Sequence, residues 1–202
     1  MKQLTLIALL ALGAAAAQSG AADSKSPPEV PPASMAPVPA GAYTLDKAHS
    51  SLVMRLDHLG FSHFTARFTR FDADLKLDPA NLAASSVKVN VDPHSLDSDN
   101  APAGFMDQLR GNMWLDVAKY PQITFRSTKV EKVGAKGVRI TGDLTLHGVT
   151  RPISGNVSAS ADRYVGSTTV SQRDFGIEPI AVAGGLVKVK NEVRIDFAIA
   201  SR

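Results

Sequence analysis

Residues 142–152 read GDLTLHGVTRP, and this stretch decides the fold class. Leu144 and Leu146 alternate with polar neighbours, which is the period-two pattern of a strand with one buried face. Gly148 interrupts the alternation and Pro152 opens the next extended segment, so the local prediction is a hairpin. Similar alternation precedes and follows the stretch, without a helical pattern between. The sequence therefore predicts an all-β protein.

The N-terminal part carries export signals. Residues 1–22 combine Lys2, an apolar run from Leu4 to Leu12 and a small-residue end, the pattern of a cleaved signal peptide. Six of the chain's 12 prolines follow within 13 residues, so residues 23–41 are predicted to form an extended, solvated linker. One globular domain is expected over residues 42–202, which is long enough for a sizeable core.

Composition and motifs exclude several function classes. The chain has no cysteine, so it has no thiol chemistry, no thiolate metal ligands and no disulfides. Its net charge is only +3, and the charges are interspersed, which argues against a nucleic-acid partner. Neither a GxSxG elbow, an HExxH motif nor a glycine-rich phosphate loop occurs. We therefore expect a protein that is not an enzyme and carries no metal or cofactor.

Alternating apolar residues predict about eight strands in the domain. The phase of the alternation changes near Thr69 and Arg70, which predicts a β-bulge that bends the strand. The predicted strands are centred on residues 52–56, 64–77 with the bulge, 87–91, 123–125, 138–146, 153–157, 165–170 and 193–199.

A different pattern occupies residues 97–120. Phe105, Leu109 and Met113 recur at a spacing of four with Trp114 beside them, which predicts a short helix packed on the mouth or flank of the sheet. Strands and helix together fit an eight-stranded antiparallel up-and-down barrel with a helical insertion, whose interior could hold one small ligand. A two-sheet sandwich is the alternative.

The apolar positions that would face inward suit either a packed core or the lining of a ligand cavity, because both need the same alternation. They are Leu52, Met54, Leu56, Phe64, Phe68, Phe71, Val89, Phe125, Leu144, Leu146, Ile195 and Phe197. Arg110 and the pair Arg173–Asp174 suit either ordinary surface ion pairs or the bidentate binding of a phosphate or carboxylate head group at the mouth.

Four motifs in order resemble the YceI-like family of periplasmic polyisoprenoid-binding proteins. They are LDHLGFSHF at 56–64, DQLRGNMWLDVAKYPQITFRS at 107–127, LTLHGVTRP at 144–152 and QRDFGI at 172–177. The resemblance implies a lipocalin-like eight-stranded barrel whose interior holds a long isoprenoid or fatty-acyl chain. It also implies that the apolar inward residues line this tunnel.

The same resemblance assigns residues to the site. It places Asp107, Leu109, Arg110 and Trp114 near the lumen and His58 near its opening, whereas it leaves Arg173 and Asp174 either at the ligand or bracing the barrel. Ala66 stands where the family often has glycine, which would narrow the local packing. We expect His147 to shape the hairpin turn rather than to bind a ligand.

The expected function is therefore a periplasmic carrier for a long-chain isoprenoid, of polyprenyl or quinone type, or for a fatty-acyl lipid. The expected partners are this lipid, a membrane that the protein contacts transiently, and a second copy in a homodimer. One alternative is a histidine-dependent metal-binding or stress-response protein that uses His58, His63 and His147. Another is a solid-cored interaction module tethered by the proline-rich segment.

Overall fold

A computed structural model describes residues 39–58, 62–134, 137–159, 163–179, 181–182 and 187–201. The predicted signal peptide and most of the predicted linker lie outside these residues.

The hairpin predicted from residues 142–152 is present. Strand β8 (Gly137–Leu146) pairs with β9 (Val149–Ala159), and Leu146 lies opposite Val149. His147 and Gly148 between them have φ values of 51° and 75°, so both turn residues are left-handed, as in the turns that match the twist of a hairpin. Pro152 does not open β9 as expected. It lies inside the strand opposite Asp143, because β9 already begins in register with the turn.

The described residues form twelve strands and one α-helix, so the predicted all-β class is confirmed. Eleven of the strands follow one path, β1-β4-β5-β7-β8-β9-β10-β12-β2-β3-β6, and every neighbouring pair is antiparallel. The remaining strands are β1 (Gly41–Thr44), β2 (Ser51–His58), β3 (Ser62–Phe68), β4 (Phe71–Leu77), β5 (Ser86–Val91), β6 (Leu96–Asp97), β7 (Ile123–Val133), β10 (Arg163–Ser171), β11 (Ala181–Val182) and β12 (Val187–Ala200).

The expected count of eight strands is not confirmed, and the chain between β3 and β4 shows one reason. Thr69 and Arg70 form a bend that ends β3, rather than a bulge inside one continuous strand. The Thr69 amide leaves the β2–β3 ladder and donates to the carbonyl of Ser95 at 3.1 Å. Residues 45–50 likewise separate β1 from β2. The change of phase near Thr69 and Arg70 indicates an irregularity in the sequence, but it does not distinguish a bulge from the end of a strand.

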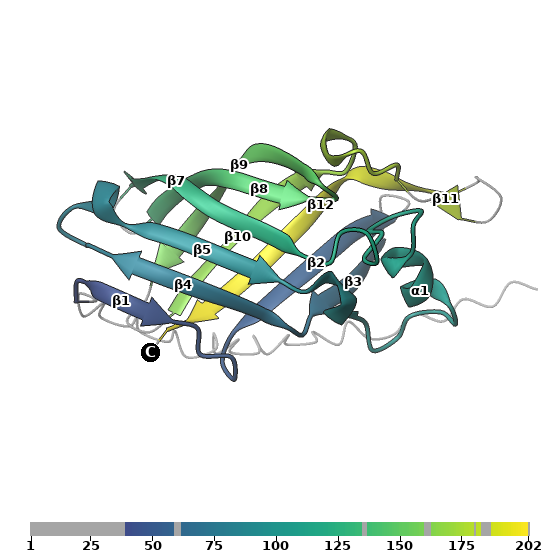
Figure 1. Cartoon of the computed structure of the whole chain (residues 1–202), viewed down its shortest axis with the longest axis horizontal. Helices are drawn as coiled ribbons and strands as arrows, with labels where there is room; N and C mark the ends of the chain where they lie inside the picture. Colours follow the sequence, from purple (N-terminus) through teal and green to yellow (C-terminus); the bar gives the residue numbers. More distant parts are fainter. Residues whose placement is uncertain are drawn as a thin grey trace, which may run out of the picture. The chain divides into compact units, whose positions relative to one another are not determined.

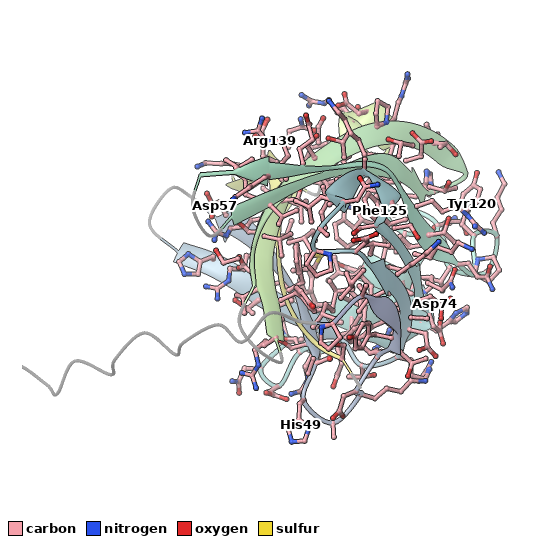
Figure 2. The ribbon with its side chains drawn as sticks, turned by 90° about the vertical axis from the view of Figure 1, so that its left-hand side faces the viewer. His49, Asp57, Asp74, Tyr120, Phe125 and Arg139 are labelled. Carbon is pink, nitrogen blue, oxygen red and sulfur yellow. The ribbon has the colours of Figure 1, made fainter. Side chains whose placement is uncertain are left out.

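The sheet curves into a half-barrel around an apolar interior (Figure 1). The long strand β12 pairs with β10 along one edge and with β2 along the other. An isolated antiparallel bridge joins Leu45, just after β1, to Ser201, just after β12. Viewed from the side, Phe125 lies inward while Asp74, Arg139 and His49 lie at the periphery (Figure 2).

The helix is shorter than predicted. Helix α1 spans Phe105–Arg110 and ends at Gly111, whose amide donates to the carbonyls of Asp107 and Gln108 at 2.8 and 3.2 Å. Met113 was expected on its buried face but is 83% exposed, because the helix has already ended. The described residues also contain three 3₁₀ turns: η1 (Leu82–Ala84), η2 (Pro93–Ser95) and η3 (Arg173–Phe175). Among the described residues no helix is long and apolar enough to span a membrane.

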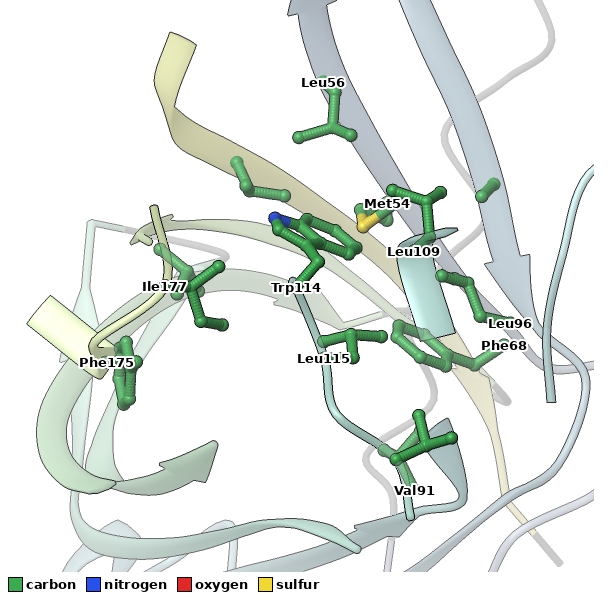
Figure 3. Packing of buried hydrophobic residues seen from close by; sticks show 14 of the residues in the cluster. Met54, Leu56, Phe68, Val91, Leu96, Leu109, Trp114, Leu115, Phe175 and Ile177 are labelled. Carbon is green, nitrogen blue, oxygen red and sulfur yellow. The ribbon is translucent and has the colours of Figure 1, made fainter. Parts of the chain in front are cut away.

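Two apolar clusters occupy the interior. The larger one packs Leu109 of α1, Leu96 of β6, Phe175 of η3 and the loop residue Trp114 against the inner face of the sheet (Figure 3). The smaller one lies where β1, β4 and β12 meet, and contains Leu45, Ala73, Leu75 and Ile199. The helix and loops therefore cover one end of the curved sheet, and its interior remains apolar along its length.

Candidate functional site

The inner face of the sheet encloses a cavity of about 520 Å³, within the range of roughly 300–1,000 Å³ found for small-molecule sites. Strands from β2 to β12 contribute to its wall, and the side chains that they present are mostly aliphatic or aromatic. The inward-facing apolar residues therefore form both a packed core and the lining of a cavity, because the interior is packed at one end and hollow elsewhere.

Eleven of the eighteen predicted site residues line this cavity. They are Leu52, Met54, Phe68, Phe71, Val89, Trp114, Phe125, Leu144, Leu146, Ile195 and Phe197. All except Trp114 lie on strands and point to the inner face, so strand register alone brings them together. Their contact with a ligand stays a prediction.

Three predicted apolar residues lie in the packed end instead. Leu56 and Leu109 are buried members of the larger cluster. The Phe64 ring packs edge-on against Phe105 of α1, with ring centroids 5.0 Å apart. Helix α1 therefore packs against β3 at Phe64, and none of the three side chains lines the cavity.

The predicted charged residues also lie outside the cavity wall. The Arg110 guanidinium donates two hydrogen bonds to the carbonyl of Leu96, at 2.6 and 3.2 Å, and so braces α1 against β6. Arg173 is exposed and lies 3.4 Å from the Glu178 carboxylate. Asp174 is exposed, and its carbonyl accepts a hydrogen bond from Arg151. His58 ends β2, and its side chain lies outside the described residues.

Sequence reasoning missed many lining residues. Most continue the alternation of a strand whose other members were named, as Leu75 does for Phe71 and Val193 for Ile195. Leu115 and Ile177 are in loops, where no periodic signal exists. The strand residues that could have been found are Leu75, Leu77, Val87, Val91, Ile123, Val130, Val138, Ile140, Ile153, Val157, Tyr164, Val170, Val193 and Ile199.

Two glycines make room for the largest rings of the wall. A β-carbon at Gly142 would lie 2.6 Å from Cζ of Phe125, and one at Gly166 would lie 2.6 Å from Cζ of Phe197. Separations this short are not tolerated in a packed protein interior. Because these positions are glycine, the two rings can lie close against the sheet and leave space in the cavity.

Buried polar groups near the cavity are hydrogen-bonded to the protein. Gln172 is 2% exposed; its side-chain oxygen accepts from the Trp114 indole, and its amide donates to the carbonyl of Lys190 at 2.8 Å. Burial, and then the neighbouring Tyr43, raise the pKa of Tyr164 above its ordinary value, so this phenol stays neutral. Within the described part of the chain, no buried side-chain nitrogen or oxygen lacks a partner.

The histidines named as alternative ligands are separated by their elements. His63 lies on β3 opposite Asp57, and His147 lies in the β8–β9 turn. The Nδ1 atom of His147 is 3.2 Å from the carbonyl of Phe175, and its ring packs on Tyr120. His147 therefore links the hairpin to η3. Among the described residues, no three histidine, aspartate or glutamate side chains gather as metal ligands would.

Comparison with known proteins gives relatives over nearly the whole domain. The YceI-like domain matches residues 43–201. A UPF0312 protein of Vibrio cholerae is 38% identical over 169 residues, which are 78% of this chain and 87% of that protein. A UPF0312 protein of Shewanella baltica is 35% identical over 158 residues, 71% of this chain and 82% of that protein.

Solved structures share the fold. BcnA of Burkholderia cenocepacia is similar with a TM-score of 0.64 and 25% identity, covering 77% of this chain and 98% of that one. A polyisoprenoid binding domain from Saccharophagus degradans, implicated in plant cell wall breakdown, has a TM-score of 0.57 and 19% identity. That alignment covers 79% of this chain and 97% of the other. At 19% identity, this similarity shows a shared fold.

Proposed function

This chain belongs to the YceI-like family, and we propose that it is a carrier that holds one long-chain isoprenoid, of polyprenyl or quinone type, or a fatty-acyl lipid in its cavity. The observation that carries the proposal is the apolar cavity of about 520 Å³ inside the curved sheet. The fold shared with a polyisoprenoid binding domain supports the ligand class. The proposed role is binding and contains no catalytic step.

The hydrophobic effect is large enough for an apolar cavity to bind such a lipid without polar contacts. Burial of one methylene group contributes about 0.8 kcal/mol, so one five-carbon isoprene unit contributes roughly 3 to 4 kcal/mol before losses. Several units exceed the roughly 8 kcal/mol of a micromolar complex even after the ordering of ligand and protein is subtracted. Affinity then comes from the chain, and a head group sets mainly its orientation.

The proposal includes an eight-stranded lipocalin-like barrel as the functional container. If β1 and β2 count as one interrupted strand, and β3 and β4 as another, the path has eight members apart from the short β6 and β11. The bridge between Leu45 and Ser201 supports closure of this wall, since it joins the first strand to the last. A closed wall would keep the lipid chain from water during transit.

The signal-peptide pattern of residues 1–22 supports export, and we place the carrier in the periplasm, where it would exchange lipid through transient contact with a membrane. The expected homodimer stays a prediction.

A matched pair of valine substitutions tests the binding proposal. Val89 lines the cavity, whereas Val165 is 48% exposed on the outer face. Val89→Thr keeps the shape but adds a hydroxyl that a bound lipid would desolvate, at roughly 1–3 kcal/mol. We measure the polyprenol concentration that displaces bound cis-parinaric acid. We expect Val89→Thr to raise this concentration about tenfold or more, and Val165→Thr to leave it unchanged. Absence of saturable binding to the unmodified protein would refute the proposal.

A further inference from the structure

The ladders of the first four strands leave a window in the wall. The β1–β4 ladder ends at Thr44 and Asp74, and the β2–β3 ladder begins only at Val53. Residues 45–52 and 68–73 face each other between these ends, and all of them are described. No ladder pair joins the two segments.

The backbones on the two sides of this window are bound to different neighbours. On one side the Asp46 amide donates to the carbonyl of Ala200 at 2.9 Å. On the other side the Thr69 amide donates to the carbonyl of Ser95 at 3.1 Å. Side chains alone therefore fill the space between the segments. Where neighbouring strands are paired, the wall opens only if backbone hydrogen bonds break, but here it can open by the movement of side chains.

A groove of about 940 Å³ lies outside the window and is lined by both of its edges. Four apolar residues, Leu52, Phe68, Phe71 and Val91, line this groove and the internal cavity alike. Each of these side chains thus has the cavity on one side and the groove on the other. Together they form a thin apolar partition between the two spaces.

The groove is more polar than the cavity and carries charged side chains. Lys47 from one edge forms an ion pair with Asp72 from the other, with 2.7 Å between Nζ and Oδ2. Both side chains are more than half exposed, at 66% and 58%. This pair crosses the window. Arg70 binds Asp92 beside it, also at 2.7 Å. Charged and hydrogen-bonding groups suit a polar head group, and the partition suits an apolar chain.

We propose that this window is a lateral portal through which the chain of a lipid enters and leaves the cavity while its polar head group rests in the outer groove. The proposal rests on the proposed function, because it names the path to the same cavity. The Lys47–Asp72 pair is the latch of the portal, and the partition residues are its gate.

A reversible cross-link tests the portal. The chain has no cysteine and a single tryptophan, Trp114, which lines the cavity. Lys47→Cys with Asp72→Cys, bridged by a short bis-methanethiosulfonate reagent, would hold the window shut. Uptake of dibromostearic acid is followed by quenching of Trp114. We expect uptake and release to slow at least tenfold with unchanged affinity, and reductant to restore both rates.

The control cross-link uses an ion pair that does not span the window. Lys129 and Glu131 also lie 2.7 Å apart, but both are on β7. Lys129→Cys with Glu131→Cys, bridged in the same way, should leave both rates unchanged. The portal proposal would be wrong if the two cross-links slowed uptake equally, or if the protein with the bridged window took up lipid as fast as the unbridged protein. In both cases the proposed lipid binding would stand. If the unmodified protein takes up no probe, the proposed function fails and the portal with it.

A charge-removing variant gives an independent measurement. Asp72→Asn unlatches the window without changing its shape. Exposed ion pairs contribute weakly, so we expect uptake and release to accelerate together, by no more than about fivefold. Glu131→Gln removes the matched pair on β7 and should change neither rate. Acceleration of uptake alone, or no change with Asp72→Asn, would contradict the assigned latch.

Discussion

The ring of Phe197 packs against the backbone of Gly166, its register partner on the neighbouring strand β10. A β-carbon at Gly166 would approach Phe197 Cζ to 2.6 Å and would also meet the carbonyl of Asn156 on β9. A β-carbon at Gly142 on β8 would likewise lie 2.6 Å from Cζ of Phe125 on the neighbouring strand β7, although the register partner of Phe125 is Leu144. Two bulky rings therefore lie against glycine, and the cavity keeps its bore although it is lined by aromatic side chains.

Gly166→Ala should destabilise the protein, because a methyl group there forces the ring and the β9 backbone to shift. Overpacking of this kind costs about 1–3 kcal/mol, measured as the free energy of unfolding in urea. Gly155→Ala is the matched control on β9. Its β-carbon would find Ser167 O at 3.3 Å and Phe197 Cε1 at 4.0 Å, so the neighbours need to move by only a few tenths of an ångström. Equal stability of the two variants would contradict the packing described.

Gln172→Leu should be strongly destabilising. The substitution leaves the Trp114 indole and the carbonyl of Lys190 without their partner, and each buried group left unpaired costs about 1–3 kcal/mol. Urea unfolding followed by Trp114 emission measures the loss. Gln172→Glu keeps an acceptor for the indole but loses the amide donor, so it separates the two contacts. A Leu variant as stable as the unmodified protein would show that this network contributes nothing.

Stability should fall at high pH because of Tyr164. Burial and then Tyr43 raise its pKa above the ordinary value of 10.0, so the folded state keeps a proton that the unfolded chain loses. The contribution is complete below the unfolded pKa and disappears as pH rises through the folded pKa. Unfolding free energies at about pH 9 and about pH 11 should differ more in the unmodified protein than in Tyr164→Phe.

Tyr43→Phe serves as the control for this measurement. Because burial is the larger cause of the raised pKa, this variant should keep most of the Tyr164 part of the pH dependence. An unchanged slope in Tyr164→Phe would rule out the assignment.

The lining of the cavity could be predicted from sequence where strands alternate regularly. Ile195 and Phe197 alternate with their neighbours in the same phase as Val193 and Ile199, so all four side chains point to one face of β12. The inward position of one therefore predicts the inward position of the others. Whether that face borders a cavity or a filled core depends on the space left between side chains. That space depends on register partners such as Gly166 and Phe197, which lie far apart in sequence and carry no local signal.

The ends of β3 and of the helix could not be predicted from the sequence for a related reason. The change of phase at Thr69–Arg70 indicates an irregularity, but it does not show that the Thr69 amide leaves the ladder for the carbonyl of Ser95 in η2. Met113 was assigned to a helix by spacing alone, but Gly111 ends the helix first. Tertiary partners outweigh local pattern at both places. The charged residues Arg110 and Arg173 likewise have protein partners that a motif does not reveal.

The most direct test of the account is native mass spectrometry of the protein purified without detergent. The account predicts a species heavier than the polypeptide by one long-chain lipid, released by organic extraction and restored by an added polyprenol. A mass equal to that of the polypeptide alone, before and after incubation with polyprenols and fatty acids, would contradict the claim that the cavity holds lipid.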